Sequence, residues 1–103
     1  MTRHKILASA LAELDEAATW YEEHEEGLGQ DLVTEYRERL ELAIKMPGVG
    51  GLVGTTPAGA VVRRHRLKRF RRYAILLVVI DDVPTVVAFE HSSRRPGYWR
   101  DRL

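Results

Sequence analysis

The sequence YAILLVVI occupies residues 73–80 and is apolar at every position. Side chains alternate between the two faces of a β-strand, so this run indicates a central strand that is covered on both faces. Residues 81–84 read DDVP, which is typical of a turn, and residues 85–90 form a second run rich in β-branched residues. The two runs therefore predict neighbouring strands of a β-meander.

The segment before this strand is strongly basic. Residues 63–72 read RRHRLKRFRR and hold seven Lys or Arg residues without an acid. A strand here would project Arg64, Arg66 and Lys68 from one face and His65 from the other. Such charges can grip phosphates, or they can be solvated charges that keep sheet edges from pairing. The density of cations favours a surface that binds a polyanion or an acidic partner.

The start of the chain predicts a short strand followed by a helix. Residues 5–8 form the strand, and Ser9 is placed to cap a helix that begins at Ala10. Apolar residues then recur at intervals of three and four at Leu11, Leu14, Ala17, Ala18 and Tyr21. Trp20 and Tyr21 are expected to be core or hairpin residues.

Two glycines at residues 27–29 break this helix, and a second one is predicted from about Gln30 to Met46, where Pro47 ends it. Helices joined by so short a turn should pack as an antiparallel hairpin. Residues 48–59 contain five glycines and predict a loop. We therefore expect one α+β domain over residues 1–103, with a short N-terminal strand and a two-helix hairpin on one face of a mainly antiparallel sheet.

A two-helix layer covers only one face of a sheet, whereas residues 73–80 present apolar side chains to both. Something else must shield the second face. The candidates are the C-terminal tail with Tyr98 and Trp99, a second copy of the chain, or another protein. An exposed apolar face of this size is unusual on a monomer, so we expect a protein partner.

Charge is distributed unevenly along the chain. Residues 1–46 hold 5 Lys or Arg against 11 Asp or Glu, whereas residues 47–103 hold 11 against 4. This asymmetry indicates a charged partner, although acidic helices could also offset a basic sheet within one fold. The absence of cysteine excludes disulfides and thiolate metal sites and favours the cytoplasm. We expect no membrane segment, because the longest apolar run is far shorter than the ~20 residues that span a bilayer.

The candidate functional residues are mainly cations. Arg64 and Arg66 on the basic strand, with Arg94 and Arg95 near the end of the chain, are suited to holding phosphates. His91 could act as a general acid or base, or it could be a plain hydrogen-bonding residue. No metal-ligand spacing and no phosphate-binding glycine loop is present, so we expect no cofactor and no metal. Any phosphodiester cleavage would then rely on arginines to stabilise charge.

Tyr98 and Trp99 are adjacent aromatic residues near the end of the chain. They can stack on a base, or they can cap the open face of the sheet. We assign Tyr98 to the site, where nearby cations would lower the pKa of its hydroxyl, and Trp99 to packing.

Several segments resemble, in the same order, those of the RelE/ParE superfamily of type II toxin–antitoxin toxins. They are ALAELDEAATWYE at 10–22, the basic run at 63–72, YAILLVVID at 73–81, VVAFEH at 86–91 and RRPGYWRDR at 94–102. The resemblance covers nearly the whole chain. It implies a growth-inhibiting toxin that forms a hetero-oligomer with a small cognate antitoxin, which covers the basic or apolar surface of the toxin.

The resemblance leaves two targets open. RelE-like members cut mRNA on the ribosome, and Arg64, Arg66, Arg94 or Arg95, and Tyr98 fall at matching places. However, the arginine that such nucleases carry early in the central strand is Ala74 here, unless Arg72 substitutes for it. ParE-like members poison DNA gyrase and have a long helix hairpin, so the resemblance favours this class. A third interpretation is an inactive toxin fold that only binds a partner.

Overall fold

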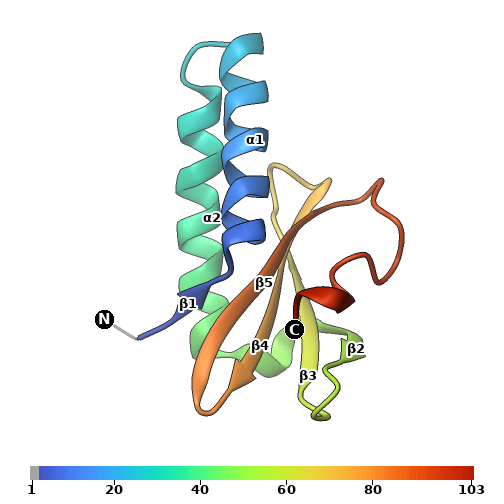
Figure 1. Ribbon diagram of the computed structural model, residues 1–103. Helices are drawn as coiled ribbons and strands as arrows, with labels where there is room; N and C mark the ends of the chain where they lie inside the picture. Colours follow the sequence, from blue (N-terminus) through green and yellow to red (C-terminus); the bar gives the residue numbers. More distant parts are fainter. Residues whose placement is uncertain (1–2) are drawn as a thin grey trace.

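The computed structural model describes residues 3–103, which form a helix hairpin packed on a five-stranded sheet (Figure 1). The elements are β1 (Lys5–Ile6), α1 (Ala8–His24), α2 (Leu28–Lys45), β2 (Gly51–Thr55), β3 (Val61–Arg66), β4 (Tyr73–Ile80) and β5 (Val83–His91), with 3-10 turns at Pro47–Val49 and Arg100–Arg102. The strand order is β1-β5-β4-β3-β2, and only β1, beside β5, pairs in parallel. The predicted fold class is confirmed.

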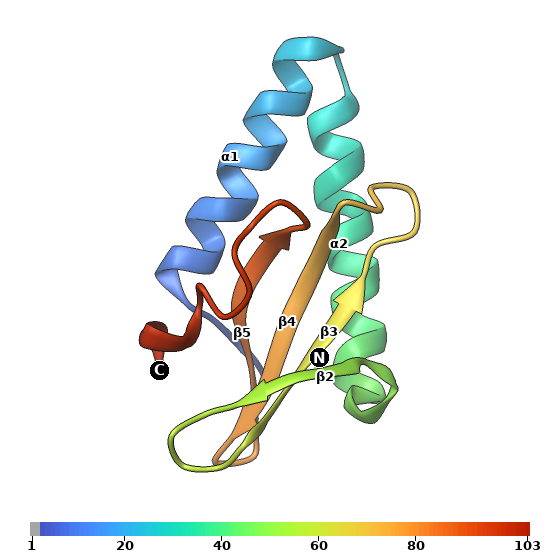
Figure 2. The ribbon, with the colours of Figure 1, turned by 90° about the vertical axis from the view of Figure 1, so that its right-hand side faces the viewer.

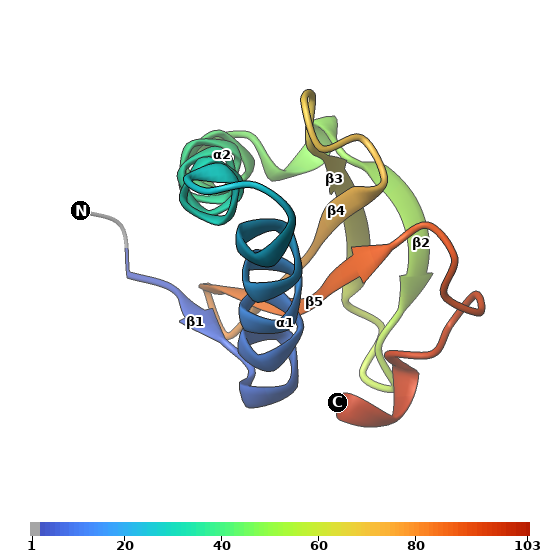
Figure 3. The same cartoon turned by 90° about the horizontal axis from the view of Figure 1, so that it is seen from above.

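The hairpin covers one face of the sheet and extends beyond its upper end (Figures 1 and 3). Its buried stripe consists of Ala10, Leu14 and Ala17 from α1 and Leu32, Tyr36, Leu40 and Ala43 from α2. Gly27 adopts a positive φ of 87° at the turn, which favours glycine. A Cβ at Gly29 would collide with the carbonyl oxygen of Ala18, so both glycines allow a tight connection.

Two predictions for α1 are wrong. Ser9 does not cap the helix, because Leu7 donates its N–H to Val86 and accepts from Leu11 N–H, so β1 passes directly into a helix that begins at Ala8. The start at Ala8 replaces the expected start at Ala10. Of the two places expected for Trp20, the hairpin is correct and the core is not, since 54% of its surface is exposed. It lies beside the buried stripe rather than within it, whereas Tyr21 packs against the core.

The predicted loop at residues 48–59 is also wrong in part, because β2 lies within it. This strand pairs antiparallel with β3 at the edge of the sheet (Figure 2). Glycine is depleted in strands, so its abundance concealed β2. Gly54 packs closely against the tail, because a Cβ there would come within 3.2 Å of the Trp99 indole.

The central strand β4 is covered on both faces over most of its length, as predicted. Ile75 and Leu77 face the helices, whereas Leu76 and Val78 belong to a second cluster under the C-terminal tail. Trp99 lies at the centre of that cover and is 1% exposed. The chain therefore shields this face itself. An uncovered apolar face was the reason for expecting a protein partner, and that reason no longer holds.

The basic strand β3 ends at Arg66, so Lys68 lies in the β3–β4 loop and not on the strand as predicted. Arg64 and Arg66 pair with Leu76 and Ala74 of β4, on the face opposite the helices. His65 faces the helices and is 2% exposed, as the alternation predicts. Neither helix in residues 3–103 is long and apolar enough to cross a membrane.

Candidate anion-binding site

Four arginines from three separate segments line one small pocket of about 180 Å³. Arg64 and Arg66 come from β3, Arg72 from the β3–β4 loop and Arg94 from the segment after β5. Ala74, Glu90, Ser92 and Pro96 complete the lining. We call this the arginine pocket. Residues far apart in the sequence thus converge on one cationic site, as required for binding a phosphate or a carboxylate.

The arginines of the pocket differ in how they are held. The Arg64 Nε donates to Glu90 Oε1 at 2.8 Å, and the Glu90 side chain is 8% exposed, so this ion pair fixes Arg64. Arg66 and Arg72 are exposed and have no carboxylate partner within residues 3–103. Their guanidinium groups can therefore turn toward an incoming anion.

The loop that carries Arg72 is tied at both ends. The Glu35 carboxylate on α2 accepts hydrogen bonds from the backbone N–H groups of Lys68, Arg69 and Phe70. Burial raises the pKa of Glu35, but these bonds outweigh burial and leave the pKa below its usual value. The Ser92 N–H donates to the Arg72 carbonyl at 2.7 Å, which joins the loop to the start of the tail.

A largely buried carboxylate on α1 anchors the tail. Arg102 donates to Glu13 through two nitrogens, at 2.8 and 3.0 Å, and the Tyr98 hydroxyl donates to it at 2.7 Å. The Phe89 N–H also donates to it at 3.1 Å, and Arg94 lies 3.7 Å away. We call this group the Glu13 cluster. It holds both ends of the tail, including Arg94 of the arginine pocket, against α1.

The position of Tyr98 contradicts the expected lowering of its pKa. Burial, followed by the hydrogen bond to Glu13 and the charge of Glu13, raises the pKa of Tyr98 despite the nearby Arg102. The hydroxyl points to α1, and Tyr98 is not part of the arginine pocket. The cations near Tyr98 are its neighbours in the sequence, whereas its carboxylate partner Glu13 is 85 positions away and leaves no local signal.

The stability of the fold should therefore fall at alkaline pH, in part through Tyr98. Because its folded-state pKa exceeds the unfolded value of 10.0, the stabilising contribution is complete below pH 10 and is lost as the pH rises toward the folded-state pKa. Urea midpoints measured from about pH 9 to about pH 11 should decrease, and less steeply in Tyr98→Phe. The urea midpoint of Tyr98→Phe should still decrease somewhat with pH, since burial raises the pKa of Tyr36 to about 12. Equal slopes in the two proteins would contradict this.

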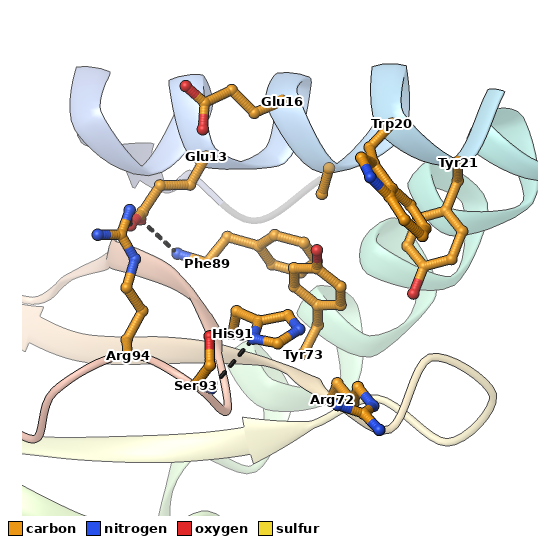
Figure 4. A pocket seen from close by; sticks show the side chains of 11 residues that line it. Glu13, Glu16, Trp20, Tyr21, Arg72, Tyr73, Phe89, His91, Ser93 and Arg94 are labelled. Carbon is orange, nitrogen blue, oxygen red and sulfur yellow. Dashed lines mark hydrogen bonds and ion pairs between the residues drawn. The ribbon is translucent and has the colours of Figure 1, made fainter. Parts of the chain in front are cut away.

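The remaining candidates lie elsewhere. His91 is in a neighbouring cleft, where its Nδ1 accepts from the Ser93 N–H at 3.0 Å and lies 2.7 Å from the Ser93 hydroxyl (Figure 4). Arg95 is exposed and does not line the arginine pocket. His65 is buried near α2, and burial together with Arg39 and Arg63 lowers its pKa. The structure thus brings together Arg64, Arg66 and Arg94 and leaves His65 and Arg95 outside their pocket, whereas His91 lines the neighbouring cleft together with Arg94.

Three residues that matter here were not among the sequence candidates. Glu13, Glu90 and Arg102 form the ion pairs that hold the pocket and the tail. Arg72 was considered only as a substitute for Ala74, and both line the pocket. Within residues 3–103, no group of three His, Cys, Asp or Glu side chains is placed to hold a metal ion.

Comparison with known proteins does not assign the chain. No protein-family model matches it, and no curated protein matches its sequence significantly.

Proposed function

We propose that this protein is the toxin of a type II toxin–antitoxin module, that it acts in the cytoplasm, and that its target is DNA gyrase, as in ParE-like toxins. The observation that carries the choice of target is the hydrogen bond from Tyr98 to Glu13. A tyrosine whose pKa is raised, and which donates to the Glu13 carboxylate, is poorly suited to removing a proton from an RNA hydroxyl. Ala74 lines the arginine pocket where a nuclease would need another cation.

The arginine pocket suits the expected partner as well. A small acidic antitoxin would place a carboxylate among Arg64, Arg66, Arg72 and Arg94. Arg66 and Arg72 are available for such a contact, whereas Arg64 is already paired with Glu90. The resulting complex would be a hetero-oligomer in which the antitoxin neutralises the charge of this face.

One observation favours the RelE-like alternative. Four arginines around a pocket of about 180 Å³ could stabilise the charge that develops on a phosphate during cleavage, without a metal. Arg72 lines the pocket beside Ala74 and so could supply the missing cation. In this case His91 or Tyr98 would have to move a proton, and the protein would cut ribosome-bound mRNA.

Three assays test the proposal together. Induced expression should arrest growth, purified protein should inhibit gyrase supercoiling, and ribosome-bound mRNA should stay intact. Arg66→Ala should leave growth arrest in place but weaken antitoxin binding, so that about tenfold more co-expressed antitoxin is required to restore growth, the equivalent of one lost charge-assisted contact. The matched control is Arg71→Ala, because Arg71 is an exposed cation of the adjoining loop that does not line the pocket.

The outcomes separate the candidate functions. Codon-positioned cuts in mRNA that disappear in Arg66→Ala or Tyr98→Phe would replace the gyrase target with RelE-like cleavage. Normal growth under full expression of folded protein would leave only the third interpretation, an inactive toxin fold that binds a partner.

A further inference from the structure

A second and larger cleft lies between α1 and the ends of β4 and β5, with a volume of about 660 Å³ (Figure 4). Four aromatic side chains line it, namely Trp20, Tyr21, Tyr73 and Phe89. We call this second cleft the aromatic cleft. The function proposed above makes no use of it.

The aromatic side chains are ordered by contacts within the protein. The Tyr73 ring stacks on Phe89 with ring centroids 4.9 Å apart, and the Trp20 ring stacks on His24 at 3.8 Å. Trp20 is nevertheless 54% exposed, in contrast to the buried Trp99. A large flat ring that is held in place and left open is a stacking surface for another planar group.

The aromatic cleft opens onto the arginine pocket. Arg72 and Arg94 line both, and Arg94 also lies 3.7 Å from Glu13, which lines the cleft from α1. Glu16, which is exposed on α1, lies at the opposite side of the cleft (Figure 4). The two sides of the cleft therefore carry opposite charge. The side near β4 and β5 favours an anion, and the side near α1 favours N–H donors.

His91 adds a directed donor to this cleft. Its Nδ1 accepts the Ser93 N–H, so in the neutral ring the proton is on Nε2. This leaves Nε2–H to donate to a ligand oxygen between the aromatic side chains and the two arginines. A planar group, a hydrogen-bond acceptor and an anion, in this order, are the parts of a nucleotide.

We propose that the aromatic cleft binds a nucleotide, free or within a single-stranded RNA, with its base on Trp20 and its phosphate between Arg72 and Arg94. The proposal goes beyond the toxin function and does not depend on it. Guanine is the base that suits Glu16, because its N1–H and N2–H groups are adjacent donors to the two oxygens of a carboxylate. GMP is therefore the appropriate probe.

Isothermal calorimetry with GMP should give a measurable Kd, and Trp20→Ala should weaken binding by about tenfold or more, as expected for loss of one stacked base. Arg72→Gln should weaken it by a similar factor, whereas the matched control Arg71→Gln should leave it unchanged. In wild-type protein, GMP should quench the fluorescence of exposed Trp20, while buried Trp99 supplies a constant signal. Circular dichroism verifies that each variant is folded.

The result is decided by three comparisons. The proposal is overturned if inorganic phosphate binds as tightly as GMP. It is also overturned if Trp20→Ala binds GMP with the affinity of the wild-type protein. A 5′-phosphorylated oligoribonucleotide that binds far more tightly than GMP would identify the source of the nucleotide as RNA, and equal affinities would identify it as a free nucleotide. Because growth arrest and supercoiling do not enter these measurements, failure here is distinguishable from failure of the toxin proposal.

Discussion

Replacing Glu13 with alanine should lower the free energy of unfolding by about 3–5 kcal/mol, the range for a buried ion pair that loses one partner. The Glu13 side chain is 10% exposed and that of Arg102 is 17% exposed, so solvent cannot replace the lost carboxylate effectively. The Tyr98 hydroxyl and the Phe89 N–H lose the same acceptor. Urea denaturation followed by far-ultraviolet circular dichroism measures the effect.

Glu16 provides the matched control for this substitution. It lies one turn along the same helix, is exposed, and forms no ion pair within residues 3–103. Glu16→Ala should therefore change stability by no more than about 0.5 kcal/mol. Similar losses in both variants would show that helix propensity or net charge, and not the Glu13 cluster, sets the stability.

Trp99→Ala should cost about 3–5 kcal/mol, which is the range for removal of a fully buried large aromatic side chain. The indole covers the sheet face formed by Val62, Leu76 and Val87, and it lies directly over Gly54 of β2. Its loss leaves a cavity between the tail and the sheet and uncovers apolar surface. Thermal unfolding measures the first effect and binding of the dye ANS the second.

The other tryptophan serves as the control. Trp20→Ala removes the same side chain from an exposed position, so its effect on stability should be under about 1 kcal/mol. If Trp99→Ala is as mild as Trp20→Ala and binds no ANS, the tail does not shield the sheet, and the case for a protein partner on this face returns.

The sequence was most informative where one periodicity dominated. Eight apolar residues identified β4, intervals of three and four identified the hairpin, and alternation placed Arg64 and Arg66 opposite His65. Each of these signals depends on neighbours within one element. For the same reason, β2 was missed, because its Gly54 packs against an indole from the far end of the chain, which the local sequence does not show.

The candidate site was predicted less completely, because its residues are held by distant partners. Composition showed that arginines gather in the second half, but it could not show that Glu13 holds Tyr98 or that Glu90 holds Arg64. The sequence left Trp20 open between the core and the hairpin surface, because only the geometry of the helix shows on which side of the apolar stripe it falls. The ion pair between Glu13 and Arg102 joins residues 89 positions apart, so no pattern in the local sequence indicates it.

The contacts between α1 and the tail also bear on the kinetics of folding. The helix hairpin is built from local contacts and can form as soon as residue 45 is available. In contrast, β1 pairs with β5, and Glu13 meets Arg102 across 89 positions, so these steps close very long loops. During synthesis, the ribosome must release the chain beyond residue 102 before Arg102 can pair with Glu13 and hold the tail that carries Arg94. A nascent chain would therefore acquire its cationic site last, after its helices are already formed.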